Sequence, residues 1–332
     1  MKILLYTEFE KQIEKSGLGK AIRHQMRALE ENNIPYTTNP NDDFDIVHIN
    51  FYGFKSYFMA KRAHRLGKKV IYHAHSTEED FRNSFKFSNV LAPLFKWWIC
   101  KCYRLGDHII TPTPYSKKLL ENYGLTNISA ISNGIDTSFF QKDKRLGMEF
   151  RKKYGYSSDD KVIMGIGLYL ERKGILDFVR LAQMLPEYKF IWFGYTDLRL
   201  VPKKIRDAVN INLPNLIFAG YVDQMMIKGA LSGANLYIFP TLEETEGIPI
   251  MEACSCKQRA IVRNIPVFSD WLIDGVNVYK ANDVDDFYVK IKKVLNNELP
   301  DLTSSGYGVA LSRDVKKVGK ELIQVYENVM KS

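Results

Sequence analysis

The sequence of 332 residues has few cysteines and no long apolar run. Its four cysteines form two Cys-x-Cys pairs, at 100/102 and 254/256, whose one-residue spacers do not match those of zinc sites. Both pairs lie in apolar surroundings with a helical pattern, which predicts buried free thiols. Because no apolar run reaches the roughly 18 residues of a membrane span, no transmembrane helix is expected. The start, MKILLYTEFEK, is too short an apolar run for a signal peptide, and we expect an intracellular protein.

Internal repeats and low-complexity tracts are absent from the sequence as well. The composition is that of a globular protein, with 45% apolar and 26% charged residues, and the length suggests two domains. The formal net charge is +9 and the pI is about 9.1. Such an excess suits a nucleic acid, an anionic lipid or a phosphorylated ligand, and charge alone does not choose among them.

Short β-rich runs alternate with helical patterns along the chain. The expected strands are 2–7, 45–50, 69–75, 108–113, 128–134, 162–168, 190–195, 216–221, 236–241 and 260–264. The expected helices are 17–31, 54–66, 91–105, 115–123, 174–185, 223–233, 249–256, 285–297 and 313–330. This alternation predicts two doubly wound α/β domains with parallel sheets, facing each other across a cleft.

A polar stretch at 141–160 separates the two halves of this pattern, and we expect a linker near 136–160. The expected N-terminal domain is 1–140 and the expected C-terminal domain is 141–312. The last segment, 313–332, is expected to form a helix that packs back towards the N-terminal domain. In such folds ligands bind beyond the carboxyl ends of the strands.

Two motifs follow strands of the first domain. Gly17 and Gly19 of Ser-Gly-Leu-Gly-Lys open a helix, where free amides favour a phosphate. A dinucleotide fingerprint needs a third glycine where Ile22 stands, so a nicotinamide site is disfavoured, and a plain glycine turn stays open. His73 and His75 share one side of a strand that a polar, acidic loop follows, which favours a functional site over ordinary half-buried histidines.

The pair Asp43 and Asp45 resembles the metal-binding D-x-D of some sugar transferases. It directly precedes a strand, however, so we interpret it as structural. In the second domain, Glu171-Arg172-Lys173-Gly174 opens a helix. Cations at the amino end of a helix are repelled by the helix dipole, which costs stability unless a bound anion offsets the repulsion. Arg172 and Lys173 therefore predict an anion site.

Residues 240–256 read PTLEETEGIPIMEACSC, with seven residues between Glu244 and Glu252. A strand delivers the loop that holds Glu244, and Gly247-Ile248-Pro249 opens a helix with free amides, with Glu252 expected in its first turn. One carboxylate can bind sugar hydroxyls, the amides can bind a phosphate, and the second carboxylate can bind ribose hydroxyls. A sugar nucleotide presents these three groups in that order.

Together, the motifs SGLGK, HAHSTEED, SNGID (132–136), ERKG and E-x7-E resemble those of glycosyltransferase family 4, in order and over nearly the whole chain. That family consists of retaining enzymes of the GT-B fold. The resemblance implies a catalytic His75 near the reacting sugar, a diphosphate held by Lys173, a transferred sugar held by a catalytic Glu244, and a ribose held by Glu252. The further donor-binding residues that it implies are Gly17, Gly19, Arg172, Gly247 and Ile248.

One position departs from the family pattern. The family usually has an arginine after the glycine that ends the strand before Lys173, whereas Leu168 follows Gly167 here, and we expect Arg172 to supply the missing charge. Within the family, the short length, the basic charge and the loop HSTEEDF look most like the bacterial diglucosyldiacylglycerol synthases. That likeness implies an acceptor-binding and membrane-associating N-terminal domain and a C-terminal domain that binds the nucleotide sugar.

The implied reaction moves glucose from UDP-glucose to monoglucosyldiacylglycerol with retention, giving diglucosyldiacylglycerol. The expected partners are UDP-glucose, the glycolipid acceptor and anionic lipids, for a peripheral protein on the cytoplasmic face of the cell membrane. No tightly bound cofactor and no protein-bound metal are expected. Mg²⁺ could still raise activity by screening phosphates or lipids.

Other functions stay open because E-x7-E concerns the donor alone. They include a UDP-galactose-dependent glycolipid galactosyltransferase and a family 4 transferase for polysaccharide or protein glycosylation. The sequence does not fix the linkage. The basic pI also suggests nucleic acid, since some phage DNA glucosyltransferases share this architecture, but no recognition helix or stacking motif supports that class, and no nucleic-acid partner is expected. A non-catalytic nucleotide-sugar-binding protein is disfavoured because all the site residues are present.

Residues 91–107 predict a membrane-facing helix, with Pro93 at its start and Gly106 at its end. A helical projection puts Leu94, Leu105 and their apolar neighbours on a face towards the sheet. The opposite side carries aromatics among cations, as interfacial membrane surfaces do. The membrane-binding residues that we expect are Lys96, Trp97, Lys101, Tyr103 and Arg104. A fully buried helix is the alternative.

Overall fold

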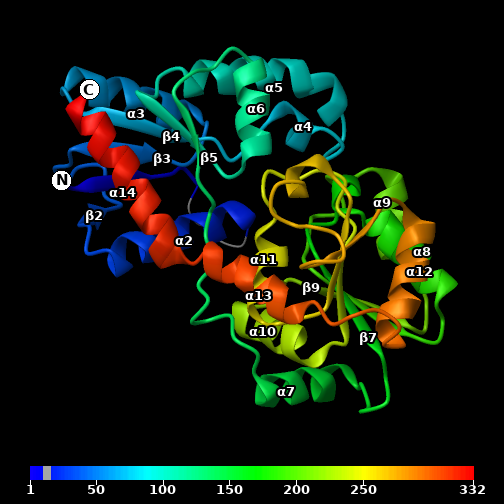
Figure 1. Ribbon diagram of the computed structural model, residues 1–332. Helices are drawn as coiled ribbons and strands as arrows, with labels where there is room; N and C mark the ends of the chain where they lie inside the picture. The colour runs from blue at the N-terminus through cyan, green and yellow to red at the C-terminus, as the bar shows by residue number, and fades with distance from the viewer. Residues whose placement is uncertain (10–15) are drawn as a thin grey trace. The chain divides into compact units, whose positions relative to one another are not determined.

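The computed structural model describes residues 1–9 and 16–332 and contains two compact units (Figure 1). Met1–Phe81, Val90–Asp136 and Ser312–Ser332 form the first unit, and Arg82–Asn89 with Thr137–Leu311 form the second. The segment Arg82–Asn89, which the sequence analysis placed in the first domain, therefore belongs to the second unit. Both units have the predicted α/β architecture with a parallel six-stranded sheet.

The sheet of the first unit has the strand order β2-β1-β3-β4-β5-β6. Its strands are β1 (Ile3–Tyr6), β2 (Tyr36–Thr37), β3 (Ile46–Ile49), β4 (Lys69–His73), β5 (His108–Thr111) and β6 (Ile128–Ala130). Its helices are α2 (Gly17–Glu31), α3 (Phe54–Arg65), α4 (Glu78–Phe81), α5 (Ser88–Tyr103), α6 (Pro114–Asn122) and α14 (Val315–Lys331).

Alternation along the strands places two apolar layers on this sheet. Ile3 and Leu5 of β1 join the buried cluster formed with α2 and α14, whereas Leu4 joins the cluster formed with α3 and α5. Successive strand side chains point to opposite faces, so a continuous apolar run such as ILLY fits a sheet that is covered on both sides. The C-terminal helix α14 packs on α2 in this layer (Figure 1).

The sheet of the second unit has the strand order β12-β11-β10-β7-β8-β9. Its strands are β7 (Val162–Ile166), β8 (Lys189–Phe193), β9 (Leu216–Gly220), β10 (Leu236–Phe239), β11 (Ala260–Arg263) and β12 (Tyr279–Ala281). Its helices are α7 (Lys144–Tyr154), η1 (Glu171–Lys173), α8 (Ile175–Met184), α9 (Lys203–Val209), α10 (Gln224–Gly233), α11 (Ile248–Ser255), η2 (Pro266–Phe268), α12 (Val284–Leu295) and α13 (Thr303–Ser312).

The stretch 141–160, predicted to be part of a linker, contains helix α7 instead. Asp143 caps the helix by accepting a hydrogen bond from the Leu146 amide at 3.0 Å, and Leu146 is buried on its inner face. Gly147 permits a close approach to α10, because a Cβ at that position would lie 3.1 Å from the Gly233 Cα. The helix is therefore packed into the second unit, and most of its charged residues are exposed.

Each sheet reverses its direction of winding between two neighbouring strands. In the second unit, β7 continues into α8 on one face of the sheet, while the adjacent β10 leads to α11 on the other (Figure 1). In the first unit, the neighbours β1 and β3 lead to α2 and α3 on opposite faces. In open α/β sheets such switch points, at the carboxyl ends of the strands, are where ligands bind.

Several smaller predictions can also be compared with the structure. The four cysteines are buried and free, as predicted. Asp45 accepts a hydrogen bond from the Lys2 amide at 2.7 Å and Asp43 pairs with Lys68 at 2.9 Å, so the D-x-D pair serves the local fold. Among the helices of residues 1–9 and 16–332, none has the length and apolarity needed to cross a membrane.

Candidate functional site

Lys173 and Glu244 meet at the switch point of the second unit. Lys173 ends η1, after β7, and Glu244 lies in the loop after β10, so two adjacent strands deliver them to the same edge of the sheet. The Lys173 Nζ lies 2.5 Å from the Glu244 Oε1, and the Thr241 hydroxyl donates to the same oxygen at 3.0 Å. Both charged side chains are largely buried, at 15% and 8% exposure. The arrangement places a cation, which can bind an anion, beside a carboxylate, which can accept hydrogen bonds from hydroxyls.

Gly174 allows Lys173 to reach this position. Its φ is +75°, and a Cβ there would lie 2.1 Å from the carbonyl oxygen of Pro240. Only glycine tolerates both the left-handed backbone and the backbone contact. The glycine of the ERKG motif thus brings the loop after β7 against the loop after β10.

Glu252 and Gly247 belong to α11 and its start. Gly247 is the N-cap, with φ +97°, and Glu252 is the fifth residue of the helix, so it lies in the second turn and not in the predicted first turn. Glu252 is fully buried. Burial, followed by the charges of Glu252 and Glu244, raises the pKa of the Tyr237 hydroxyl well above its usual value. Both carboxylates of the E-x7-E segment therefore lie near the same buried tyrosine of β10.

The start of α11 offers backbone amides, but fewer than the sequence analysis assumed. Pro249 has no N–H, and the Ile250 N–H donates to the Gly247 carbonyl at 3.1 Å. In the described part of the chain, no hydrogen bond occupies the amides of Gly247 and Ile248. These two amides are the donors that an anion could use at this helix end.

Arg172 holds two segments of the second unit together. Its Nε donates to the Ser84 Oγ at 2.8 Å, its Nη1 approaches the Glu243 carbonyl at 3.4 Å, and its N–H points to the Asn83 carbonyl at 3.4 Å. Leu168, at the position where the family usually has arginine, packs against the apolar cluster of this unit. The Arg172 guanidinium thus binds protein groups, and Lys173 is the cation that lies at Glu244.

In the first unit the histidine loop extends from β4. The His73 and His75 rings stack with centroids 4.0 Å apart, and the His75 Nε2 lies 2.9 Å from the Asn50 Oδ1. Burial, and then repulsion from His48, lowers the pKa of His75 to about 3, so this imidazole is neutral near pH 7. Gly17 and Gly19 form the first turn of α2 after β1, and the Gly19 amide donates to the Ser16 Oγ at 3.3 Å.

Asn50 and Gln25 were missed by the sequence analysis. Asn50 directly follows β3, and Gln25 lies on α2, two turns beyond the glycine loop. The position of Asn50 after a strand next to that of His75 was a signal that could have found it. Gln25 carried no such signal, because a glutamine in a helical pattern is ordinarily a surface residue.

The helix predicted to face the membrane spans Ser88–Tyr103, so Pro93 lies inside it and not at its start. The prediction for Tyr103 is wrong: it is 1% exposed and donates to the Ser76 carbonyl at 3.1 Å. Leu94, predicted to face the sheet, is 61% exposed. Lys96 pairs with Glu78 at 3.3 Å and lies over the Tyr123 ring, so it is held within the first unit.

Trp97, Lys101 and Arg104 remain exposed on that helix and its end. Trp97 is 57% exposed, and the Lys101 ammonium lies 5.2 Å from its ring centroid. The predicted membrane contact depends on an exposed aromatic ring beside cations, and these three residues provide both.

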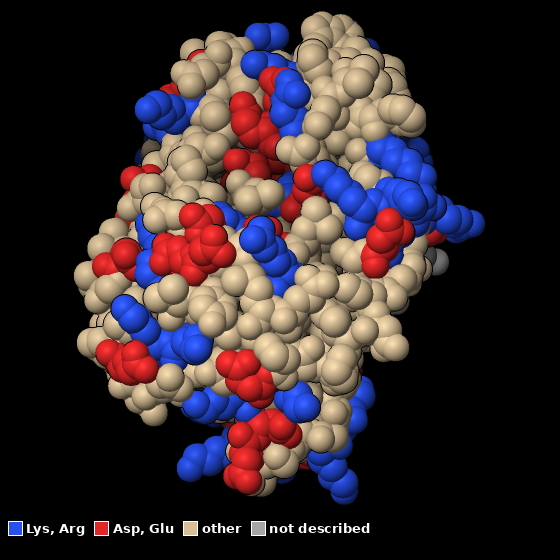
Figure 2. All heavy atoms as spheres, turned by 90° about the vertical axis from the view of Figure 1, so that its right-hand side faces the viewer, with Lys and Arg blue, Asp and Glu red and all other residues tan. Residues whose placement is uncertain are grey.

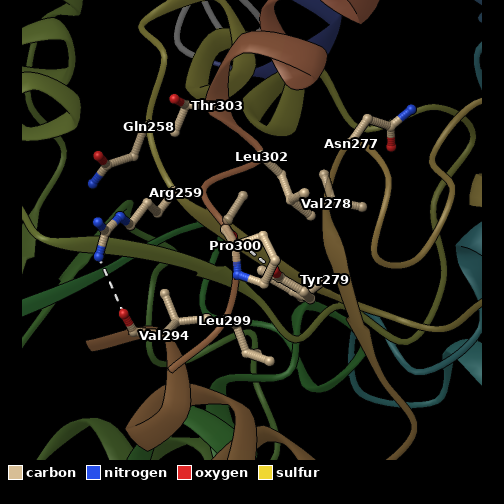
Figure 3. A pocket seen from close by; sticks show the side chains of 11 residues that line it. Gln258, Arg259, Asn277, Val278, Tyr279, Val294, Leu299, Pro300, Leu302 and Thr303 are labelled. Atoms are coloured by element: carbon tan, nitrogen blue, oxygen red, sulfur yellow. Dashed lines mark hydrogen bonds between the residues drawn. The ribbon is translucent and has the colours of Figure 1, made fainter. Parts of the chain in front are cut away.

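A small hollow in the second unit lies away from the predicted site residues (Figure 3). Ala260 and Tyr279, at the amino ends of β11 and β12, are among its lining residues, and the Arg259 guanidinium donates to the Val294 carbonyl beside it. The E-x7-E segment and Lys173, by contrast, follow the carboxyl ends of β10 and β7. Figure 2 shows cationic and anionic side chains interspersed over one face of the molecule, without a continuous basic stripe.

Two consecutive parallel α/β units, with charged residues after the central strands of the second, are the architecture of GT-B glycosyltransferases. Residues 20–139 match the model of Glycosyltransferase Family 4, and residues 148–307 match that of Glycosyl transferases group 1. The chain is 40% identical to a processive diacylglycerol alpha-glucosyltransferase of Acholeplasma laidlawii, over 100% of this chain and 99% of that protein. It is 26% identical to an alpha-galactosylglucosyldiacylglycerol synthase of Streptococcus pneumoniae, over 81% of this chain and 74% of that one.

Solved structures share the fold at low sequence identity. Anabaena HepE, in a complex with UDP and glucose, superposes with a TM-score of 0.78 at 16% identity, covering 98% of this chain and 99% of HepE. Sucrose-phosphate synthase from Thermosynechococcus elongatus gives a TM-score of 0.81 at 14% identity, covering 100% and 99%. The chain belongs to glycosyltransferase family 4. The predicted family and the predicted class of enzyme, a glycosyltransferase, are thereby confirmed.

Proposed function

We propose that this glycosyltransferase transfers glucose from UDP-glucose to monoglucosyldiacylglycerol, with retention of the α configuration, to give diglucosyldiacylglycerol. The observation that carries the donor half is the Lys173–Glu244 pair at the switch point of the second unit. The 40% identity over the whole chain to a diacylglycerol alpha-glucosyltransferase supports the lipid acceptor. HepE structures with UDP-glucose support the donor type.

The reaction breaks the bond between the anomeric carbon of glucose and the β-phosphate oxygen of UDP. An acceptor hydroxyl forms the new bond and releases its proton to water, and UDP leaves with the electron pair of the broken bond and an added negative charge. Lys173 and the amides of Gly247 and Ile248 would stabilise that charge. In other enzymes, loss of one such preorganised donor costs about 2.7–4 kcal/mol of transition-state stabilisation.

The two glutamates would hold the neutral parts of the donor. Glu244 would accept hydrogen bonds from hydroxyls of the transferred sugar, with its orientation fixed by Thr241 and Lys173. Glu252 would accept those of the ribose. Because the pKa of His75 is lowered to about 3 by burial, its neutral ring would act near the sugar as a hydrogen-bond acceptor, and not as a charged acid.

Helices α3 and α5 of the first unit would bind an anionic bilayer at the cytoplasmic leaflet. The two helices meet through Trp98, whose ring lies 4.8 Å from that of Phe54. Phe54 and Phe58 of α3 are 71% and 63% exposed, so they extend the exposed aromatic surface of Trp97. We call Phe54, Phe58, Leu94, Trp97, Lys101 and Arg104 the aromatic–basic surface.

Aromatic rings next to lysines and arginines suit the interface between lipid and water. Each cation near an anionic leaflet contributes about 1 kcal/mol. A protein held there meets an acceptor whose diacylglycerol part stays in the membrane. The aromatic–basic surface thus accounts for how a protein with a glycolipid substrate reaches it.

A galactosyl transfer is the second candidate, favoured by the likeness to the alpha-galactosylglucosyldiacylglycerol synthase. The deciding experiment incubates the purified protein with labelled UDP-glucose or UDP-galactose and vesicles that contain diacylglycerol or monoglucosyldiacylglycerol. We expect label in a diglucosyl lipid from UDP-glucose. Product from UDP-galactose alone would select the second candidate, and no lipid product from either donor would contradict the lipid acceptor.

A further inference from the structure

A chain of buried polar side chains connects helix α14 with His75 in the first unit. The Tyr326 hydroxyl lies 2.7 Å from the His48 Nδ1, and the His48 Nε2 lies 3.1 Å from the His73 Nδ1. The Gln25 Nε2 lies 2.8 Å from the His73 Nδ1 and donates to the Asn50 Oδ1 at 2.8 Å. Asn50 in turn contacts His75 at 2.9 Å.

The direction of these hydrogen bonds follows from the two amides. An amide oxygen only accepts, so the His75 Nε2, which faces the Asn50 Oδ1, must carry the proton. An amide nitrogen only donates, so the His73 Nδ1 accepts from Gln25. The His48 Nε2 then donates to the same His73 nitrogen, and the His48 Nδ1 accepts from the Tyr326 hydroxyl. Two donors then share the lone pair of the His73 Nδ1, and the His73 Nε2–H has no partner within the described residues.

Burial keeps the histidines of this chain neutral. It lowers the pKa of His48 to about 3 and that of His73 well below its usual value. A neutral imidazole has one donor and one acceptor nitrogen, so a hydrogen bond at one nitrogen decides the role of the other. Because its Nε2–H donates a hydrogen bond to the Asn50 Oδ1, His75 has its free lone pair at Nδ1.

The network contains some buried polar atoms that lack a hydrogen-bond partner. Apolar side chains in the same place would leave no such atoms. Within the described residues, the Gln25 Oε1 and the Asn50 Nδ2 have no hydrogen-bond partner. Each such group costs about 1–3 kcal/mol of stability. A structural purpose alone does not account for amides at these two positions, since apolar residues would fill the space without that cost.

We propose that Asn50 and Gln25 are positioning residues that hold His75 in the Nε2–H tautomer, so that its Nδ1 accepts a hydrogen bond from a substrate hydroxyl. The function of that Nδ1 rests on the proposed glycosyl transfer, whereas the tautomer does not. Stacking on His73 fixes the plane of the His75 ring, and Asn50 fixes its rotation within that plane. Gln25 fixes which end of the Asn50 amide faces His75.

The test is ¹⁵N NMR of the protein labelled at histidine, without substrate. The His75 signal is identified as the one that disappears in His75→Gln, which is practical because the chain has only six histidines. We expect the Nε2–H tautomer for His75 in the native protein and in Asn50→Asp, whose carboxylate still accepts. Asn50→Ala should give a mixture of tautomers. Gln25→Met, which leaves both atoms of the His75–Asn50 hydrogen bond in place, should also raise the Nδ1–H population. Asn122→Ala, an exposed asparagine of the same unit, is the control and should change nothing.

Kinetics provide the second readout. Asn50→Ala should lower kcat about tenfold or more, with the KM for UDP-glucose unchanged because other residues bind the nucleotide, and Asn50→Asp should retain most of kcat. An Nδ1–H tautomer in the native protein, or an unchanged tautomer in both Asn50→Ala and Gln25→Met, overturns the proposal. Predicted tautomers in a protein that glycosylates no lipid would contradict the proposed function and leave the positioning role intact.

Discussion

The Lys173 ammonium lies 2.5 Å from the Glu244 carboxylate. The two residues follow the adjacent strands β7 and β10, whose next α-helices, α8 and α11, cover opposite faces of the sheet. Each charge is therefore compensated before a donor binds. In the proposed reaction, the diphosphate of a UDP-sugar would contact Lys173 and its hexose hydroxyls would contact Glu244, so two new contacts would replace this one. The pair also gives each largely buried charged group a partner of opposite sign.

Replacement of Glu244 by glutamine should abolish most transfer while the fold is kept. The amide has the same shape but loses the charge that orients sugar hydroxyls and Lys173, so we expect kcat/KM to fall by about 100-fold or more. Steady-state kinetics measure this, and circular dichroism checks the fold. Glu149→Gln, which alters an exposed carboxylate of the same unit, is the control. Turnover near that of the native protein in a folded Glu244→Gln would make Glu244 an ordinary loop residue.

Replacement of Glu252 by alanine should mainly weaken donor binding. Hydrogen bonds from ribose hydroxyls to a carboxylate are worth about 1.5–3 kcal/mol, which corresponds to a KM for UDP-glucose raised roughly 10- to 150-fold. Glu252 is fully buried, so the alanine variant also leaves a cavity. Glu252→Gln fills that cavity and separates the two effects. An unchanged KM in both variants would remove the ribose assignment.

Replacement of Gly174 by alanine should destabilise the second unit and displace Lys173. The new Cβ would lie 2.1 Å from the Pro240 carbonyl oxygen. Gly155→Ala is a matched control, because Gly155 has a similar φ of +71° but nothing within 4 Å of the added Cβ. The control should show only the cost of left-handed backbone, about 1 kcal/mol, and Gly174→Ala clearly more, in urea unfolding. Equal losses in the two variants would show that the Pro240 contact does not constrain the loop.

Membrane binding should depend on the aromatic–basic surface. In flotation with anionic vesicles, Trp97→Ala/Lys101→Glu should bind more weakly than the native protein, most clearly at low salt, because cations and an exposed ring are both lost. Met148→Ala/Lys152→Glu makes a similar exposed change on α7 of the second unit and should bind normally. If the two double variants float equally well, these helices are not the contact.

Acid should destabilise the first unit through its buried histidines. Burial lowers the folded pKa of His48 and His75 to about 3, whereas histidine in an unfolded chain titrates near 6.5. Between these values the unfolded chain binds protons that the folded chain does not, so the free energy of unfolding falls as pH falls. The slope is about 1.4 kcal/mol per pH unit for each such histidine, and above pH 6.5 these groups contribute no slope.

Urea unfolding of the first unit, measured between about pH 7 and pH 4.5, gives this slope. His48→Gln should reduce it by about one histidine's share, or roughly 1.4 kcal/mol per pH unit. The same slope in the variant and the native protein would show that His48 is not held neutral by the fold.

The periodicity of the sequence predicted most of the fold because most strands are continuous apolar runs. All ten expected strands exist, from β1 to β11, but the edge strands β2 (Tyr36–Thr37) and β12 (Tyr279–Ala281) were missed. Two or three residues carry too little apolar pattern to be recognised. Helix α7 was also missed, because its charged residues outnumber the two apolar side chains that it buries, those of Leu146 and Phe150.

Candidate site residues could be chosen from the sequence where a charged or polar residue follows a strand, as Lys173, Glu244 and His75 do. Glu252 was chosen from its spacing to Glu244, and the roles of all four residues stay predictions. The position of Tyr103 was not predictable, because helical projection alone does not show that its hydroxyl reaches the Ser76 carbonyl. Nor did the sequence show that Arg172 would bind Ser84, a residue 88 positions earlier in the chain.

The most direct test of the account is the structure of the lipid product made from UDP-glucose and monoglucosyldiacylglycerol. The ¹H NMR spectrum of the purified product identifies the added sugar and its anomeric configuration in one measurement. We predict one added glucose in the α configuration, absent when Glu244→Gln replaces the native protein. A β-linked glucose would contradict the retaining mechanism, and an unmodified lipid would contradict the proposed acceptor.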